Sequence, residues 1–157
     1  MRHVICTVDT LAPGSRKLVQ IGSRSIGVFN IEGNFYALRN NCPHQGGPLC
    51  TGRLTGFVTS QVPGEFAYLR PGEILRCPWH GWEFDVKTGQ SWFDPTRTSV
   101  ATYPTRTQSG ASLAGINTRK SSQDPTPKDL CKGPHTVETY SIVVEKEYVI
   151  VEIPNSS

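Results

Sequence analysis

Two short loops, each holding one cysteine and one histidine, constrain the fold of this chain more than any other feature of its sequence. The first reads C-P-H-Q-G-G-P-L from Cys42, and the second reads C-P-W-H-G-W-E-F-D from Cys77. Gly46, Gly47 and Gly81 suit tight turns, because glycine adopts positive φ easily and lets backbone N–H groups approach a bound group. Two cysteines and two histidines in matched loops form a ligand set suited to zinc or to iron–sulfur chemistry. We therefore expect the fold to bring these two turns together.

Outside these loops the sequence predicts short strands joined by many turns. Hydrophobic residues make up 36% of the 157 residues, while 15 glycines and 12 prolines are many for a globular chain. This balance disfavours a helical bundle and predicts a single all-β domain over residues 1–157. Apolar and β-branched residues form strand-like runs at 4–8, 18–21, 26–29, 35–38, 84–86, 90–93, 137–144 and 148–153. The last two runs predict a closing hairpin.

The order of these runs predicts two parts within the domain. We expect an antiparallel base from residues 1–39 and 137–153 with parts of 83–100, and a smaller ligand-binding subdomain at about 40–83. Within the subdomain, Pro63-Gly64 and Pro71-Gly72 are turn signals.

The segment 105–134 has a different composition from the rest of the chain. It is rich in Ser, Thr, Gly, Pro, Lys, Arg and Gln and has few large apolar groups. Such a segment buries too little surface to offset the ~1–2 kcal/mol of backbone entropy lost per ordered residue. We expect a long, mobile surface loop that serves as a solvated linker; a basic docking arm for an acidic partner is the alternative.

The two loops together resemble the Rieske [2Fe–2S] signature of the Rieske ferredoxins and of the Rieske domains of ring-hydroxylating oxygenase systems. The segments V-I-C-T-V-D-T-L-A-P-G and I-G-V-F-N-I-E-G-N-F-Y-A-L-R-N-N-C-P-H resemble the family's opening strands, and V-E-T-Y-S-I-V-V-E-K-E-Y-V-I-V-E resembles its closing hairpin. The resemblance implies an antiparallel β-sandwich or barrel that carries one [2Fe–2S] cluster. It also implies that Cys42 and Cys77 hold one iron and that His44 and His80 hold the other.

The chain departs from the family pattern at two places. Residues 45–76 separate His44 from Cys77, about twice what the family usually shows, and the excess corresponds to 57–72. The second departure is the segment 105–134. Neither insertion includes a ligand position, so the departures bear on partner identity and cluster exposure.

The residues around the loops also select within the family. Rieske proteins of cytochrome bc-type complexes carry an additional, disulfide-bonded cysteine in each loop, where this chain has Gly47 and Trp79, and Cys50 is out of place for that pairing. The Ser and Tyr hydroxyls that donate hydrogen bonds at the cluster in those proteins correspond here to Trp82 and Phe84. Losing such donors lowers the reduction potential, so we expect a midpoint in the lower part of the range of about −150 to +300 mV.

The resemblance implies a soluble ferredoxin that is an electron-transfer protein and has no catalytic residues of its own. It would carry single electrons from an NAD(P)H-dependent reductase to a terminal oxygenase, a ring-hydroxylating dioxygenase or a related monooxygenase, docking transiently at a His44/His80 tip. The alternatives are a non-catalytic Rieske subunit held in a larger oxidoreductase complex and, more remotely, a structural zinc module. Only His3 and His135 lie outside the loops, which disfavours a separate catalytic iron site of two histidines and one carboxylate.

Charge and hydropathy add little further information about partners. The net charge of +3 is too small to indicate a nucleic-acid partner, and no apolar run approaches the ~20 residues of a membrane-spanning helix. The N-terminus has no secretory pattern, so we expect a reducing, cytoplasmic location in which cysteines bind metal or stay free. Cys6 is expected to be a small buried strand residue, Cys50 an idle buried thiol and Cys131 an exposed one.

Overall fold

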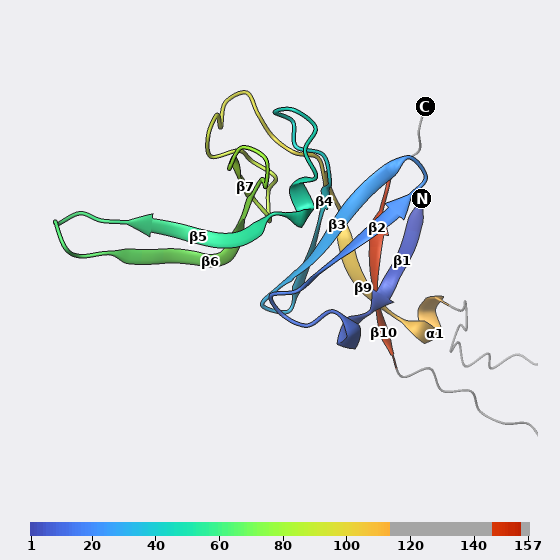
Figure 1. Ribbon diagram of the computed structural model, residues 1–157. Helices are drawn as coiled ribbons and strands as arrows, with labels where there is room; N and C mark the ends of the chain where they lie inside the picture. The colour runs from blue at the N-terminus through green and yellow to red at the C-terminus, as the bar shows by residue number, and fades with distance from the viewer. Residues whose placement is uncertain (114–145, 155–157) are drawn as a thin grey trace, which may run out of the picture.

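The computed structural model describes residues 1–113 and 146–154, and these form three antiparallel sheets with almost no helix (Figure 1). The predicted all-β class is thus confirmed. None of the described helices is long and apolar enough to cross a membrane. The strands are β1 (Arg2–Thr7), β2 (Arg16–Ile21), β3 (Arg24–Ile31), β4 (Asn34–Arg39), β5 (Arg53–Thr59), β6 (Ala67–Arg76), β7 (Glu83–Asp85), β8 (Thr102–Tyr103), β9 (Thr105–Ser109) and β10 (Glu147–Glu152); the helical turns are η1 (Val8–Thr10), η2 (Leu49–Thr51) and α1 (Gly110–Leu113).

Two of the sheets form the base, with strand orders β2-β3-β4-β8 and β1-β10-β9. Between them lies a core of aliphatic and aromatic side chains, including Ile26, Val28 and Ala37 from the first sheet and Val149 and Val151 from the second. Alternate residues of a strand point to opposite faces of its sheet, so one face of β3 packs on β10.

The other face of β3 packs on the third sheet, of order β5-β6-β7. Phe29 and Leu38 from the base meet Leu49, Leu75 and Phe84 in a second core, and all five side chains are fully buried. Because β3 and β4 each contribute side chains to both cores, these two strands hold the base and the third sheet together.

The hairpin of β5 and β6 extends far from the rest of the molecule (Figure 1). Its outer half contains most of the segment 57–72 that the sequence marks as an insertion. Pro63-Gly64 lies at the tip, as predicted. Pro71-Gly72 was wrongly predicted as a turn, since it lies inside β6 at a bulge where the pairing jumps from Thr55↔Ile74 to Phe57↔Leu69.

The expectation of a loop over 105–134 is wrong for its first part. Residues Thr105–Ser109 form β9, which pairs with β10 from Thr105↔Val151 to Ser109↔Glu147. Pairing with a buried central strand supplies hydrogen bonds that outweigh the polar composition of β9. Residues Gly110–Leu113 form the short helix α1, and the rest of the segment, from residue 114 on, lies outside the described residues.

The C-terminal strand is confirmed, but its neighbours differ from the prediction. Strand β10 lies between β1 and β9, with Val149, Ile150 and Val151 fully buried. Both edges of β10 are therefore occupied. The sequence predicted a hairpin partner at 137–144, a segment that lies outside the described residues.

Candidate metal centre

The first cysteine–histidine loop follows β4 and is closed by two backbone hydrogen bonds. The N–H of Cys42 donates to the carbonyl of Gly47 at 2.8 Å, and the N–H of Gly46 donates back to the carbonyl of Cys42 at 2.8 Å. Gly46 has φ of 77°, a conformation that strains residues with a Cβ. The glycine therefore allows the chain to turn back on Cys42 within five residues.

The second loop, between β6 and β7, closes in the same way. The N–H of Cys77 donates to the carbonyl of Trp82 at 2.8 Å, and the N–H of Gly81 donates to the carbonyl of Cys77 at 3.0 Å. Gly81 has φ of 73°, as its counterpart in the first loop does. The two loops thus present their cysteines from equivalent backbone positions, although one more residue precedes the histidine in the second.

The four predicted ligands lie in two pairs. Cys42 and Cys77 are each 2% exposed, belong to the core between β3 and the third sheet, and lie close enough for one thiol to influence the other. The rings of His44 and His80 have centroids 4.7 Å apart, at an interplanar angle of 77°. His80 is exposed and His44 half-buried, so the sulfur pair faces the protein interior and the imidazole pair faces the surface.

The side chains of these pairs have properties that fit a metal cofactor. The Nδ1 atom of His44 is buried and has no hydrogen-bond partner, which is costly unless the atom has another ligand. Burial raises the pKa of the Cys42 thiol, and the neighbouring Cys77 adds to this effect. A bound cation would reverse that preference, because metal ligation deprotonates a thiol.

The division into pairs bears on the kind of metal centre. Among the residues that the structure describes, no three His, Cys, Asp or Glu side chains converge on a site for one metal ion. A [2Fe–2S] cluster divides its four ligands between two irons, two sulfurs on one and two imidazoles on the other in the Rieske type. Two separate pairs fit this arrangement better than they fit the four convergent ligands of a structural zinc site.

Comparison with known proteins identifies the family. A model of the Rieske [2Fe-2S] domain matches residues 1–104. The chain belongs to this family. The resemblance drawn from the two loops and the prediction of a [2Fe–2S] cofactor are thereby confirmed.

Relatives of this Rieske protein include components of oxygenase systems. The ferredoxin component of the alkene monooxygenase system of Xanthobacter autotrophicus (strain ATCC BAA-1158 / Py2) is 27% identical over 125 residues, 80% of this chain and 84% of that protein. The biphenyl dioxygenase ferredoxin subunit of Pseudomonas sp. (strain KKS102) is 27% identical over 101 residues, 64% of this chain and 79% of that protein. Among solved structures, the Sphingomonas yanoikuyae B1 ferredoxin matches 68% of this chain and 89% of its own with a TM-score of 0.50 and 25% identity.

Gly47 and Trp79 stand where Rieske proteins of bc-type complexes have their two disulfide-bonded cysteines, and these two residues are in contact here. The ring of Trp79 lies so close to Gly47 that a Cβ on the glycine would be 2.9 Å from Trp79 Cδ2. An aromatic ring packed on a glycine therefore connects the loops here. The four cysteines in the described part of the chain, Cys6, Cys42, Cys50 and Cys77, are all free.

An aromatic row that the sequence did not reveal leads from the metal centre to the surface. The Trp82 ring stacks on His44 with centroids 4.3 Å apart and an interplanar angle of 9°. Phe93 packs on Trp82 at 4.5 Å and is 70% exposed. From the sequence, Trp82 was identified as the replacement of a hydroxyl donor, and the adjacent aromatic residues Trp92-Phe93 were the one available signal for the row.

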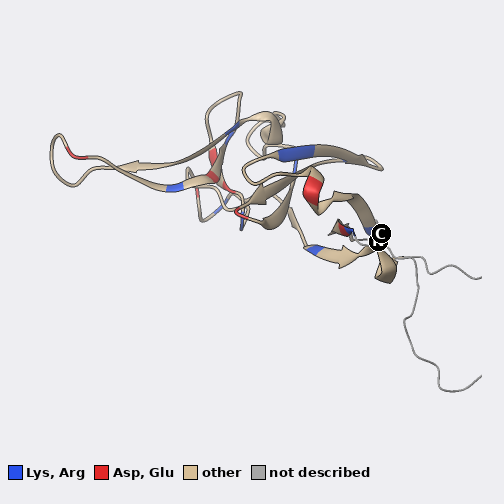
Figure 2. Cartoon of the chain, turned by 90° about the horizontal axis from the view of Figure 1, so that it is seen from below, with Lys and Arg blue, Asp and Glu red and all other residues tan. Residues whose placement is uncertain are grey.

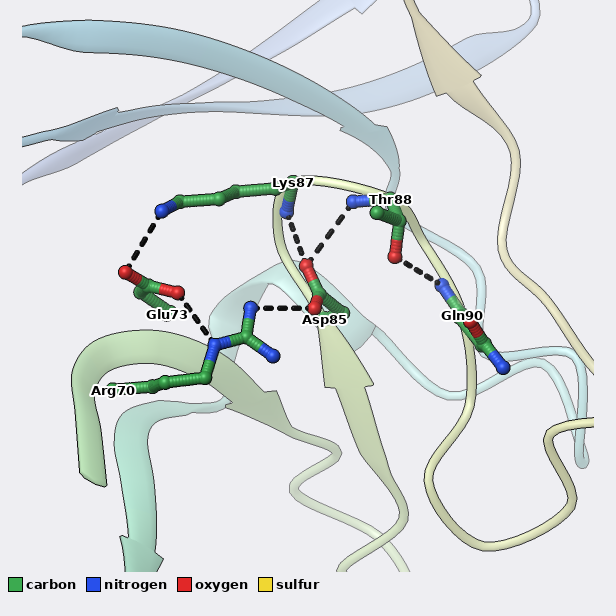
Figure 3. Close-up of polar contacts among 6 residues, drawn as sticks. All are labelled: Arg70, Glu73, Asp85, Lys87, Thr88 and Gln90. Carbon is green, nitrogen blue, oxygen red and sulfur yellow. Dashed lines mark hydrogen bonds and ion pairs between the residues drawn. The ribbon is translucent and has the colours of Figure 1, made fainter. Parts of the chain in front are cut away.

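An ion network, also missed from the sequence, connects β6 with β7 and the turn that follows it (Figure 3). Arg70 reaches Asp85 at 2.6 Å and Glu73 at 2.7 Å, and Lys87 reaches Glu73 at 2.8 Å. Lys87 and Arg70 hold the pKa of Glu73 below its usual range, and Asp85 and Glu73 raise the pKa of Arg70. Asp85, 4% exposed, also accepts the backbone N–H groups of Lys87 and Thr88.

Of the remaining cysteines and histidines, the structure describes Cys6, Cys50 and His3. Cys50 is fully buried in the core as predicted, and Cys6 is half-buried beside the bulge of β1. His3 lies in β1, where it is paired with Val151. The predictions for His135 and Cys131 concern residues outside the described part of the chain.

Proposed function

We propose that this protein is a ferredoxin that passes single electrons from an NAD(P)H-dependent reductase to a terminal oxygenase, a ring-hydroxylating dioxygenase or a related monooxygenase. The observation that carries the proposal is the orientation of the site: its two cysteines are buried toward the core, and His80 is exposed at the surface. Family membership and the names of its relatives, which are ferredoxin components of such systems, support this role.

We further propose that Cys42 and Cys77 hold one iron and that His44 and His80 hold the other. The pairing of the side chains and the unpartnered Nδ1 of His44 support this assignment. When bound, the cluster supplies reversible one-electron chemistry. The cysteine pair anchors that group where water is excluded, and the imidazole pair brings it near the surface.

Docking of both partners is proposed at the His44/His80 tip, because an electron partner must approach the group closely. His80 and Trp79 are exposed there, and Phe93 extends the same surface. We propose that the chain contributes no catalytic residue and that substrate oxidation takes place on the oxygenase. A cytoplasmic location is proposed from the unpaired cysteines expected in a reducing compartment.

A redox titration followed by EPR of the dithionite-reduced protein tests the function. We expect a Rieske signal, whose average g value is lower than that of all-thiolate clusters, and a midpoint in the lower part of the range of about −150 to +300 mV. The hydrogen-bond donors of bc-type proteins are replaced by Trp82, which stacks on His44, and by the fully buried Phe84. A midpoint above about +150 mV would contradict this expectation.

The ligand assignment has its own matched test. His80→Cys should shift the EPR spectrum toward the all-thiolate type or abolish it, whereas His3→Cys should leave the spectrum unchanged, since His3 lies in β1. An unaltered spectrum in His80→Cys would disprove the role of His80 as a ligand without affecting the family assignment.

A further inference from the structure

The outer half of the β5–β6 hairpin, residues 57–69, is called the arm here. Every residue from 58 to 69 is exposed. The set includes five large apolar side chains: Val58 68%, Val62 51%, Phe66 76%, Tyr68 56% and Leu69 48% exposed. Figure 1 shows the arm projecting well beyond the sheets from which it starts. Both faces of this ribbon are therefore open to solvent.

The root of the arm is firmly attached. Phe57 packs edge-on against Trp92 with ring centroids 5.2 Å apart, and Arg70 lies 6.0 Å from the Trp92 ring centre. Arg70 also forms ion pairs with Asp85 and Glu73. These contacts fix the direction in which the arm projects, so its exposure is a property of the fold.

The edges of the arm are unpaired in the described sheets. Strand β5 is the outer strand of the order β5-β6-β7, and β7 pairs only with residues Ile74–Arg76 of β6. An isolated two-stranded ribbon is marginally stable in water, and a third or fourth strand stabilises it. The arm therefore has backbone groups available for an added strand.

The arm lacks the charged residues that usually protect such an edge. Glu65 is its single charged residue, so Figure 2 shows it tan except for a red segment near its tip. Exposed edge strands usually carry lysines or other charges that prevent pairing with a second chain. An apolar, almost uncharged edge is thus typical of a strand that pairs in the functional state.

Charges at the start of β5 and near the tip of the arm indicate which chain would pair with it. Arg53, at the root of β5, is exposed and lies opposite Arg76, whose own ion pair is with Glu83. Neither Arg53 nor Glu65 has an ion-pair partner among the described side chains. When two copies of β5 run antiparallel, the tip of each arm lies at the root of the other, which brings Glu65 of one copy toward Arg53 of the second.

We propose that the arm is a dimerisation surface and that its partner is a second copy of this chain. The two β5 strands pair antiparallel about a two-fold axis and form a four-stranded ribbon with β6 of each copy at its edges. Both copies keep His80 exposed, because the ribbon forms on the hairpin and not on the cysteine–histidine loops. This inference adds to the proposed electron-transfer function and does not depend on it.

Sedimentation velocity of the intact, cluster-loaded protein tests the proposal. We expect a monomer–dimer equilibrium across about a hundredfold range of concentration. R53E and E65R each replace two attractions per dimer by repulsions, so each should weaken dimerisation about 2- to 30-fold. The double variant R53E/E65R should restore it, since the charges are exchanged. Val58→Lys, which places a charge on the pairing edge, should weaken it in all backgrounds.

The visible spectrum and circular dichroism of each variant confirm that the fold and the cluster are intact. A protein that sediments as a monomer at all concentrations would overturn the proposal, as would a dimer that none of the arm variants weakens. A stable heteromer formed through the arm with another protein of the native host would also overturn it and would favour the larger-complex alternative. None of these outcomes would alter the EPR signal that tests electron transfer.

Discussion

The arm lies between the two cysteine–histidine loops in the sequence, but the loops and the arm are built in opposite ways. Each loop is closed by two backbone hydrogen bonds, and its cysteine is 2% exposed. Residues 58–69 of the arm, by contrast, are all exposed. At the root of the hairpin, β5 and β6 pair in regular register, Arg53↔Arg76 and Leu54↔Leu75. This pairing connects the two loops independently of the length of the hairpin beyond it.

This difference explains how the spacing between the loops can double without disturbing the metal centre. Loop-closure entropy grows only with the logarithm of length, so a longer hairpin costs little once its root is paired. The loops are constrained by contacts within themselves and with the core. The arm is constrained only at its root, so its length can change without moving the loops.

The strongest contrast is expected from replacing a loop cysteine. In Cys42→Ser the thiolate ligand is lost, and we expect loss of nearly all visible iron–sulfur absorption together with a marked fall in thermal stability, since metal binding contributes to folding. Cys50→Ala is the matched control, because Cys50 is equally buried in the same core but lies outside the closed loops. Retained colour in Cys42→Ser would show that the loop does not hold the cluster.

Replacing a glycine should cost more stability near the core than at the tip of the arm. A Cβ at Gly52, between η2 and β5, would overlap the carbonyl oxygen of Arg76, whereas at Gly64, at the arm tip, it would meet nothing within 4 Å. We expect Gly52→Ala to lower the free energy of unfolding by about 3 kcal/mol. Gly64→Ala should cost about 1 kcal/mol, because its φ of 89° disfavours a Cβ. Urea denaturation monitored by circular dichroism measures both, and equal losses would contradict the comparison.

Local sequence patterns were sufficient to predict the loops and most of the base. Strands β1 to β4 follow runs of apolar residues between turn signals, so their information lies within a few neighbouring residues. The matched C-P-H and C-P-W-H motifs likewise placed the candidate ligands before their geometry was known.

Features that depend on distant pairing were not predictable in this way. Strand β9 has a polar sequence and is a strand because β10, far along the chain, pairs with it. Pro71-Gly72 has the composition of a turn, yet the pairing of β5 with β6 on both sides makes it a bulge. The ion pair of Arg70 with Asp85 also joins residues that no local pattern connects.

That ion pair joins Arg70, the residue that follows the arm, to β7, so breaking it tests how much the root of the arm contributes to stability. Arg70→Ala removes the charged partner of Asp85, whose side chain is 5% exposed, and we expect a loss of about 1–3 kcal/mol in unfolding free energy. Arg76→Ala, which removes a more exposed pair with Glu83, should cost about 0.2–1 kcal/mol. Denaturation curves compare the two variants, and the visible spectrum should be unchanged in both. A larger loss in Arg76→Ala would show that Asp85 does not need its arginine.

A pH effect distinguishes the buried core from the exposed arm. Burial raises the pKa of the Cys50 thiol to about 12 from its ordinary value of 9.0. Between these values the unfolded chain loses this proton while the folded chain keeps it, so stability falls as pH rises from about 9 to 12, by at most about 1.4 kcal/mol per pH unit. Cys50→Ala should flatten this part of the stability–pH curve relative to the parent, whereas Glu65→Gln in the arm should not. Parallel curves for the parent and Cys50→Ala would mean that the thiol ionises as readily in the folded protein as in the unfolded chain.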